Sequence, residues 1–163
     1  MLIRKAVRAD LPELLTIYND EVEHGIATLD LLPRTEEEGL RWFLRHNVDH
    51  HPLYVALEDG RPAAYACLSG YREKAAYDPT AELSVYVARP CRGRGVGERL
   101  LTFLLNAARA DERIHNVVSV ITEGNEASVR LHEKLGFTLC GRLPEAAVKN
   151  GRQIAVLTYS LLV

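Results

Sequence analysis

The sequence predicts a mixed α/β fold, in which helices flank a twisted, mostly antiparallel sheet that contains one parallel pair of strands. Strand-like runs at Ala81–Ala88 and Asn116–Thr122 are joined by a helical segment, and such a crossover makes the two strands parallel. Turn signals at Asp59-Gly60 and Asn150-Gly151 each lie between two apolar runs, which is typical of antiparallel hairpins. Because helices and strands are interspersed, a mixed sheet covered by helices is expected.

The first third of the chain reads as one strand followed by two helices. The strand is expected at Leu2–Val7. Asp10, followed by an early proline and by Glu13, is typical of a helix start. Thr35-Glu-Glu-Glu38 forms a capping box in front of the second helix.

The middle of the chain predicts three strands. Leu53–Glu58 and Pro62–Gly70 flank the Asp59-Gly60 turn. Ala81–Ala88 alternates between apolar and polar residues, as a strand with two different faces does. One face carries Leu83, Val85 and Val87, and the other carries Glu82, Ser84 and Tyr86.

The last part predicts two helices and three strands. Apolar spacing favours a helix from Gly95 to about Ala110, and Asn116–Thr122 reads as a buried strand. Asn125 is a suitable N-cap for a helix that ends at Leu135, and Gly136 supplies its stop. The closing strands are expected at Thr138–Arg142 and Ile154–Leu162.

Length and composition indicate one ordinary domain over residues 1–163. The net charge of −2 gives no field that would favour nucleic acid or an anionic membrane. No apolar run approaches the roughly 20 residues of a membrane helix, and the N-terminus lacks the pattern of a signal peptide. Three cysteines without ligand spacing favour free thiols in the cytoplasm and no metal site.

The most informative segment is the glycine-rich turn Arg92-Gly-Arg-Gly-Val-Gly97, between a strand and a helix. Glycines allow backbone N–H groups to close around an anion, and a helix start adds further N–H groups and a positive dipole end. Arg92 and Arg94 add charge at the rim. The turn therefore predicts a binding site for a phosphate-bearing cofactor.

The spacing of the glycines, and the residues that follow them, exclude two common kinds of phosphate-binding loop. A nucleoside triphosphate loop needs Lys-Ser or Lys-Thr after its glycines, and none follows here. A dinucleotide fingerprint needs a different glycine spacing, near the start of a larger fold. The pattern [R/Q]-x-x-G-x-[G/A] remains, and Arg92, Gly95 and Gly97 match it.

With this loop after Leu83–Val87, the chain resembles the GNAT N-acetyltransferase superfamily. The segment Asn125–Phe137 is similar to a second motif of that superfamily. The likeness is greatest to the phosphinothricin and methionine sulfoximine acetyltransferases. Features shared with that subgroup are Ile17-Tyr18-Asn19, Tyr77-Asp78-x-Thr80-x-Glu82, Ser128–His132 and Val148-Lys-x-Gly151.

The resemblance implies transfer of acetyl from acetyl-CoA, as co-substrate, to the amine of a small amino acid or analogue. Backbone groups of Val85, Tyr86 and Val87 would pair with the pantetheine arm, and Asn125 and Ser128 would lie near its end. The pyrophosphate would be held at the loop, whose residues are Arg92, Gly93, Arg94, Gly95, Val96, Gly97 and Glu98.

Two residues are expected to carry the chemistry. Glu82 is the candidate base that removes a proton from the acceptor amine, since partial burial would raise its pKa toward the operating pH. His132 stands where many superfamily members have a tyrosine, and it is the candidate donor to the departing thiolate. Attack on the thioester is expected to be direct.

Acceptor contacts are expected from Arg72, Lys74 and Tyr77, in the loop before Glu82. Thr28 and Leu29 fall where the subgroup shapes its acceptor pocket. Gln153 replaces an aromatic residue of many relatives, which points to a different or broader acceptor.

Two other functions stay open: acetylation of protein or peptide N-termini, and a non-catalytic acyl-CoA-binding module. A homodimer is also expected, because the family often forms one.

Overall fold

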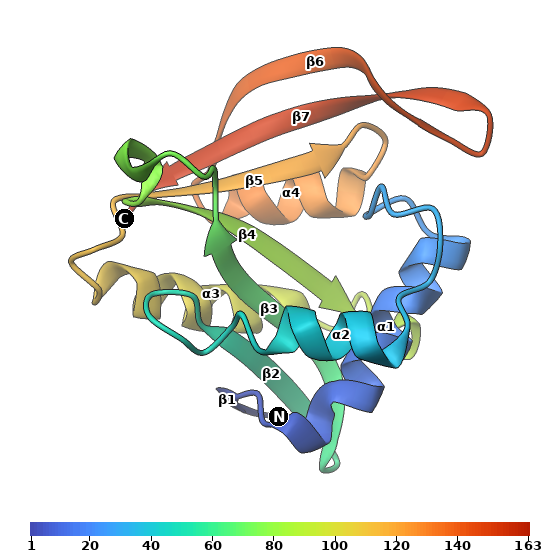
Figure 1. Cartoon of the computed structure of the whole chain (residues 1–163), viewed down its shortest axis with the longest axis vertical. Helices are drawn as coiled ribbons and strands as arrows, with labels where there is room; N and C mark the ends of the chain where they lie inside the picture. The colour runs from blue at the N-terminus through green and yellow to red at the C-terminus, as the bar shows by residue number, and fades with distance from the viewer.

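The structure is a computed structural model that describes residues 1–163. It contains a seven-stranded sheet with four α-helices (Figure 1). The strands are β1 (Leu2–Lys5), β2 (Leu53–Glu58), β3 (Arg61–Gly70), β4 (Thr80–Val87), β5 (Asn116–Thr122), β6 (Thr138–Lys149) and β7 (Arg152–Leu162). The helices are α1 (Leu11–His24), α2 (Glu36–Phe43), α3 (Val96–Arg109) and α4 (Glu126–Lys134).

The order of strands in the sheet is β1-β2-β3-β4-β5-β7-β6. Only β4 and β5 are parallel, and the other neighbours are antiparallel. The predicted mixed sheet with one parallel pair is therefore confirmed. The order was not predictable at the C-terminal end, where β7 pairs with β5 and leaves β6 at the edge.

The alternation of residues along β3 and β4 assigns one apolar cluster to each face of the sheet. Leu68 of β3 and Leu83 of β4 belong to the cluster that contains Leu100, Leu101 and Leu104 of α3. The opposite cluster joins α1 to the sheet, and its members include Leu14, Ile17, Tyr18, Val55, Tyr65 and Cys67. Glu82 therefore faces the side of the sheet on which α1 lies.

The last two strands are longer than predicted. β6 runs to Lys149 rather than ending at Arg142, and β7 begins at Arg152. Pro144 suggests an end to a strand, but a proline is compatible with an edge strand because its missing N–H costs no ladder bond. A bulge between Leu143 and Ala147, with Glu145 at φ 51°, absorbs the irregularity.

The feature that positions the site is the separation of β4 from β5. The two strands pair only where Thr80–Glu82 meets Asn116–Val118. Beyond Glu82 they diverge, as Figure 1 shows, while β4 stays paired to β3 up to Val87. The second half of β4 thus has one edge without a partner strand, in the middle of the sheet.

Candidate functional site

A cavity of about 780 Å³ occupies the gap beside the free edge of β4. Four further segments line it: residues 25–29 after α1, the loop that leads into α3, the end of β5, and α4 with its N-cap Asn125. Glu82 and His132 both line this same cavity. The residues proposed for chemistry and for phosphate binding are therefore brought together by the fold.

The glycine-rich turn has the backbone that an anion cradle needs. Gly93 and Gly95 have φ values of +70° and +76°, in the left-handed region that favours glycine. The first α3 hydrogen bond runs from Arg99 N–H to the Gly95 carbonyl, at 3.1 Å. The N–H groups of Val96, Gly97 and Glu98 precede that bond, at the positive end of the helix dipole.

The two arginines of the turn make internal ion pairs. Arg92 donates through Nε to the Val87 carbonyl, at 2.9 Å, and through Nη2 to Glu21 Oε2, at 2.8 Å. Arg94 pairs with Glu58 at 2.9 Å and does not line the cavity. Both side chains thus have protein partners, although each stays partly exposed to solvent.

The free edge of β4 presents alternate backbone groups to the cavity. Ala88 N–H donates to the Ala63 carbonyl of β3, at 2.9 Å. Because hydrogen bonding alternates along an antiparallel ladder, the N–H and C=O groups of Leu83, Val85 and Val87 point away from β3. Those of Tyr86 point toward β3, and its side chain packs edge-to-face on Tyr18, with ring centroids 5.1 Å apart.

Glu82 lies at the point where β4 and β5 part. It is half-buried and stands opposite Ser69 of β3 in the ladder. Burial raises the pKa of the Glu82 carboxyl above its ordinary value, and no cation opposes this effect. A carboxylate with a raised pKa in a cavity is suited to accept a proton near neutral pH.

His132 is held in one tautomer by its own helix. Its side chain is 1% exposed, and Nδ1 lies 2.8 Å from the carbonyl oxygen of Ser128. A carbonyl can only accept, so Nδ1 carries the hydrogen and Nε2 offers a lone pair. Nε2 is buried and has no partner within the protein. Burial lowers the pKa of the imidazole, against the opposing effect of the Ser128 carbonyl.

The start of α4 contributes two of the predicted residues. Asn125 is the N-cap, and its side chain accepts from the Ser128 N–H at 3.3 Å. The Ser128 hydroxyl lies 3.3 Å from His132 Nδ1. Both residues line the cavity on the side opposite β4.

The predicted acceptor residues Arg72, Lys74 and Tyr77 do not line the cavity. They lie on the exposed connection between β3 and β4, where the Arg72 guanidinium lies 5.6 Å from the centre of the Tyr77 ring. Thr28 and Leu29, by contrast, do line it. The residues after α1 thus share the cavity with Glu82 and His132, whereas the Arg72 loop lies outside that cavity.

Sequence reasoning missed Glu21, which lines the cavity and is 4% exposed. A signal was present, since Glu21 follows Leu14, Ile17 and Tyr18 at helical spacing and so lies on the buried face of α1. A carboxylate on such a face needs a specific partner. It also missed Ser119–Thr122, the end of β5, because an apolar strand carries no functional signature.

No helix of the structure is long and apolar enough to cross a membrane. No group of three or more His, Cys, Asp and Glu side chains is placed to hold a metal ion.

Solved structures that share this fold include acetyltransferases. One is described as ribosomal-protein-alanine N-acetyltransferase from Brucella melitensis, with a TM-score of 0.96 and 37% identity, and the match covers 100% of both chains. Another is a GNAT superfamily phosphinothricin acetyltransferase from Sinorhizobium meliloti in complex with AcCoA. It has a TM-score of 0.92 and 31% identity, and the match covers 99% of this chain and 88% of that one.

The sequence comparisons agree with the fold. The L-methionine sulfoximine/L-methionine sulfone acetyltransferase of Pseudomonas aeruginosa is 38% identical over 151 residues, covering 92% of this chain and 87% of that protein. The family model described as "Acetyltransferase (GNAT) family" matches residues 11–137 of this chain. The chain belongs to the GNAT acetyltransferase family.

Gly95→Ala tests the backbone cradle. A Cβ at φ +76° costs about 1–2 kcal/mol, and the turn can relieve this strain only by turning its N–H groups away from the bound anion. We expect the affinity for CoA to fall about 5- to 30-fold, measured by titration calorimetry. An unchanged dissociation constant, with the fold intact by circular dichroism, would contradict the role of this glycine.

Proposed function

We propose that this protein transfers the acetyl group of acetyl-CoA directly to the amine of a small amino acid or amino-acid analogue. The observation that carries the proposal is a single cavity that joins three features. These are the glycine-rich helix start, the free edge of β4, and the half-buried carboxylate of Glu82 together with the buried imidazole of His132.

Each of these lining segments would bind one part of acetyl-CoA. The N–H groups of Gly93–Glu98 would hold the pyrophosphate, and charge-assisted hydrogen bonds of this kind contribute about 1.5–3 kcal/mol each. Leu83, Val85 and Val87 would pair with the extended pantetheine arm, as a partner strand pairs with a free edge. One of their N–H groups can also face the oxyanion of the transition state. Asn125 and Ser128 would lie beside the thioester end.

Two protons must leave the acceptor ammonium during transfer, and the cavity holds a separate acceptor for each. Glu82 would take the first proton, directly or through a water, and release a neutral amine. The C–N bond then forms, and the nitrogen carries a second excess proton. His132 Nε2, which has a free lone pair, would take that proton and pass it to the sulfur as the C–S bond breaks. The products are the amide and the CoA thiol, with one proton left on Glu82.

The choice of acceptor draws on the relatives. The name of the Pseudomonas relative gives methionine sulfoximine and methionine sulfone as its acceptors, which supports an amino-acid analogue. Arg72, Lys74 and Tyr77 precede β4 in the chain, before the end of that strand at which Glu82 lies. We propose that they meet the end of an acceptor that extends out of the cavity.

Release of CoA thiol with a panel of amines tests this function. We expect release with methionine sulfoximine, methionine sulfone or phosphinothricin, and mass spectrometry should find one acetyl group on the amine. Release only with a peptide that begins with alanine would favour acetylation of protein N-termini, as in the description of the Brucella structure. Tight CoA binding without release for any amine would instead favour a non-catalytic module.

We also propose a cytoplasmic homodimer. All three cysteines are free, as expected in a reducing compartment. The edge strand β6 is exposed over nearly all of its length, with Leu139 and Leu143 among its exposed apolar residues. Burying such an edge against a second copy would remove unpaired backbone groups from solvent. Sedimentation should give twice the mass of one chain, and a monomer mass would overturn the dimer.

A further inference from the structure

Glu21 uses its two carboxylate oxygens to hold two different walls of the cavity. Oε2 accepts from Arg92 Nη2 at 2.8 Å, and Arg92 begins the glycine-rich turn. Oε1 accepts from the Ala27 backbone N–H, also at 2.8 Å. Residues 25–29 form the wall after α1, which we name the acceptor wall. One buried side chain thus touches both the turn and the acceptor wall.

Arg92 makes a second contact, which links it to the end of β4. Its Nε donates to the carbonyl of Val87, the last residue of β4, so the guanidinium is fixed at both ends. Glu21 is 4% exposed, and a buried carboxylate depends strongly on its cation. A displacement of Arg92 therefore has to be followed by Glu21.

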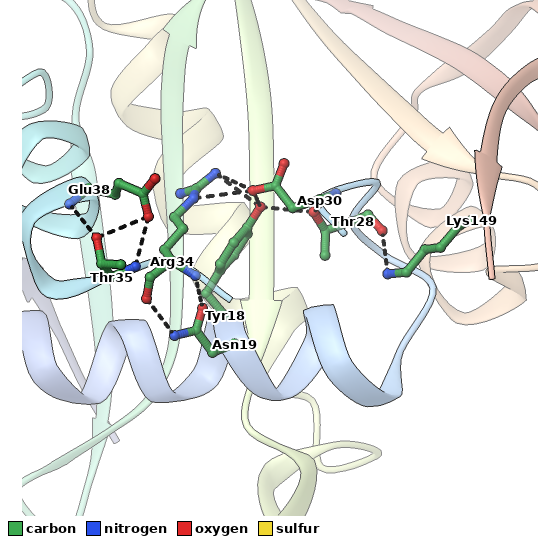
Figure 2. A network of polar contacts seen from close by, with 8 residues as sticks. All are labelled: Tyr18, Asn19, Thr28, Asp30, Arg34, Thr35, Glu38 and Lys149. Carbon is green, nitrogen blue, oxygen red and sulfur yellow. Dashed lines mark hydrogen bonds and ion pairs between the residues drawn. The ribbon is translucent and has the colours of Figure 1, made fainter. Parts of the chain in front are cut away.

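The acceptor-wall side is fitted closely to Glu21. A Cβ on Gly25 would lie 1.8 Å from Glu21 Oε1, so only glycine leaves room for the carboxylate there. The acceptor wall is also held by hydrogen bonds that do not involve Glu21, as Figure 2 shows. The Thr28 hydroxyl lies 2.8 Å from Tyr18 Oη, and Lys149 Nζ donates to the Thr28 carbonyl at 2.9 Å. Loss of the Glu21 contact should loosen Ala27 without unfolding the wall.

We propose that Glu21 is a positioning residue that couples the glycine-rich turn to the acceptor wall, so that a bound CoA tightens the site for the acceptor amine. The inference rests on the proposed function, because it assigns the turn to CoA and the wall to the acceptor. Arg92 then acts through Glu21 on acceptor recognition, rather than as a phosphate ligand. Couplings of this kind typically change affinity about 5- to 150-fold and are reciprocal.

Single and double variants separate this coupling from a direct effect on CoA. In Glu21→Gln one of the two carboxylate oxygens becomes an NH2 donor, so either Arg92 or the Ala27 N–H then faces a donor instead of an acceptor. Arg92→Gln leaves the buried carboxylate without its cation. We expect each variant to raise the acceptor KM about tenfold at saturating acetyl-CoA, with a much smaller change in the CoA dissociation constant. The double variant places two amides face to face and should recover part of the loss.

Asp20→Asn is the matched control. Asp20 is the neighbour of Glu21 and pairs with Arg89 just before the turn, but this ion pair is exposed and does not reach Ala27. The acceptor KM of this variant should equal that of the unchanged protein. If Arg92→Gln weakens CoA binding while the acceptor KM stays constant, or if Asp20→Asn has the same effect as Glu21→Gln, the coupling is wrong.

Hydrogen exchange gives a readout that does not depend on catalysis. Addition of CoA should slow exchange of the Ala27 amide in the unchanged protein, and the slowing should disappear in both single variants. Equal slowing in all three proteins would overturn the coupling. Failure of the unchanged protein to release CoA with any amine, with this exchange pattern intact, would overturn the proposed acceptor chemistry alone.

Discussion

We expect Glu82→Gln to lower kcat by about 10²- to 10⁴-fold, the usual contribution of a general base. The amide keeps the size and much of the polarity of the carboxylate but cannot take a proton from the acceptor ammonium. Because Glu82 lies outside the glycine-rich turn, CoA affinity should change little. Steady-state kinetics and calorimetric titration of CoA measure the two effects separately.

Glu73→Gln is the control for the loss of one negative charge. Glu73 is exposed on the connection between β3 and β4 and makes no ion pair. Its kcat should match that of the unchanged protein. Turnover of Glu82→Gln at the unchanged rate would end the assignment of Glu82 as base.

The second large effect is expected from His132→Gln, which removes the lone pair of Nε2 from the cavity. We expect kcat to fall by about 10²-fold, since the thiolate then has to leave without a proton. Phe137→Leu is a suitable control, because the Phe137 ring packs on His132 with centroids 4.9 Å apart. If loosened packing alone caused the loss, both variants would show it.

The pH dependence separates two roles for His132. A proton carrier must be neutral at the start, and burial lowers the pKa of His132, so it is neutral at and above neutral pH. Glu82 must be ionised, and its raised pKa places the loss of activity at higher pH than for an ordinary glutamate. Activity should therefore fall about tenfold per pH unit below the pKa of Glu82, without an alkaline decline due to His132. A decline above the lowered pKa of His132, absent in His132→Gln, would make it a pre-protonated acid instead.

Local patterns predicted much of the donor side. The alternation in Ala81–Ala88 correctly placed Leu83 in the core and Glu82 on the opposite face, because a strand repeats every two residues. Of the glycines in the turn, Gly93 and Gly95 have positive φ values, whereas Gly97 lies in the first turn of α3. Membership of the GNAT family, inferred from the motifs at Arg92–Gly97 and Asn125–Phe137, is confirmed by the comparisons.

These local patterns could not predict contacts between residues that are far apart in the chain. Glu21 and Arg92 are 71 positions apart in the chain, and no local signal links them. The sequence alone could not show that Thr28 and Leu29 line the cavity while Arg72 does not, because this depends on how the segment after α1 packs beside β4. Lys149 looks like an ordinary residue before a turn, and only the approach of the β6 end to Thr28 buries it.

The sequence by itself determined the family, the mixed sheet and the glycine-rich helix start, since each depends on periodicity or spacing within about thirty residues. Tertiary structure decided where β4 leaves β5 and which backbone groups face the cavity. It also decided that Arg92, although partly exposed, pairs with the buried carboxylate of Glu21. These outcomes depend on distances between segments remote in the chain, which are set when the two faces of the sheet pack against their helices.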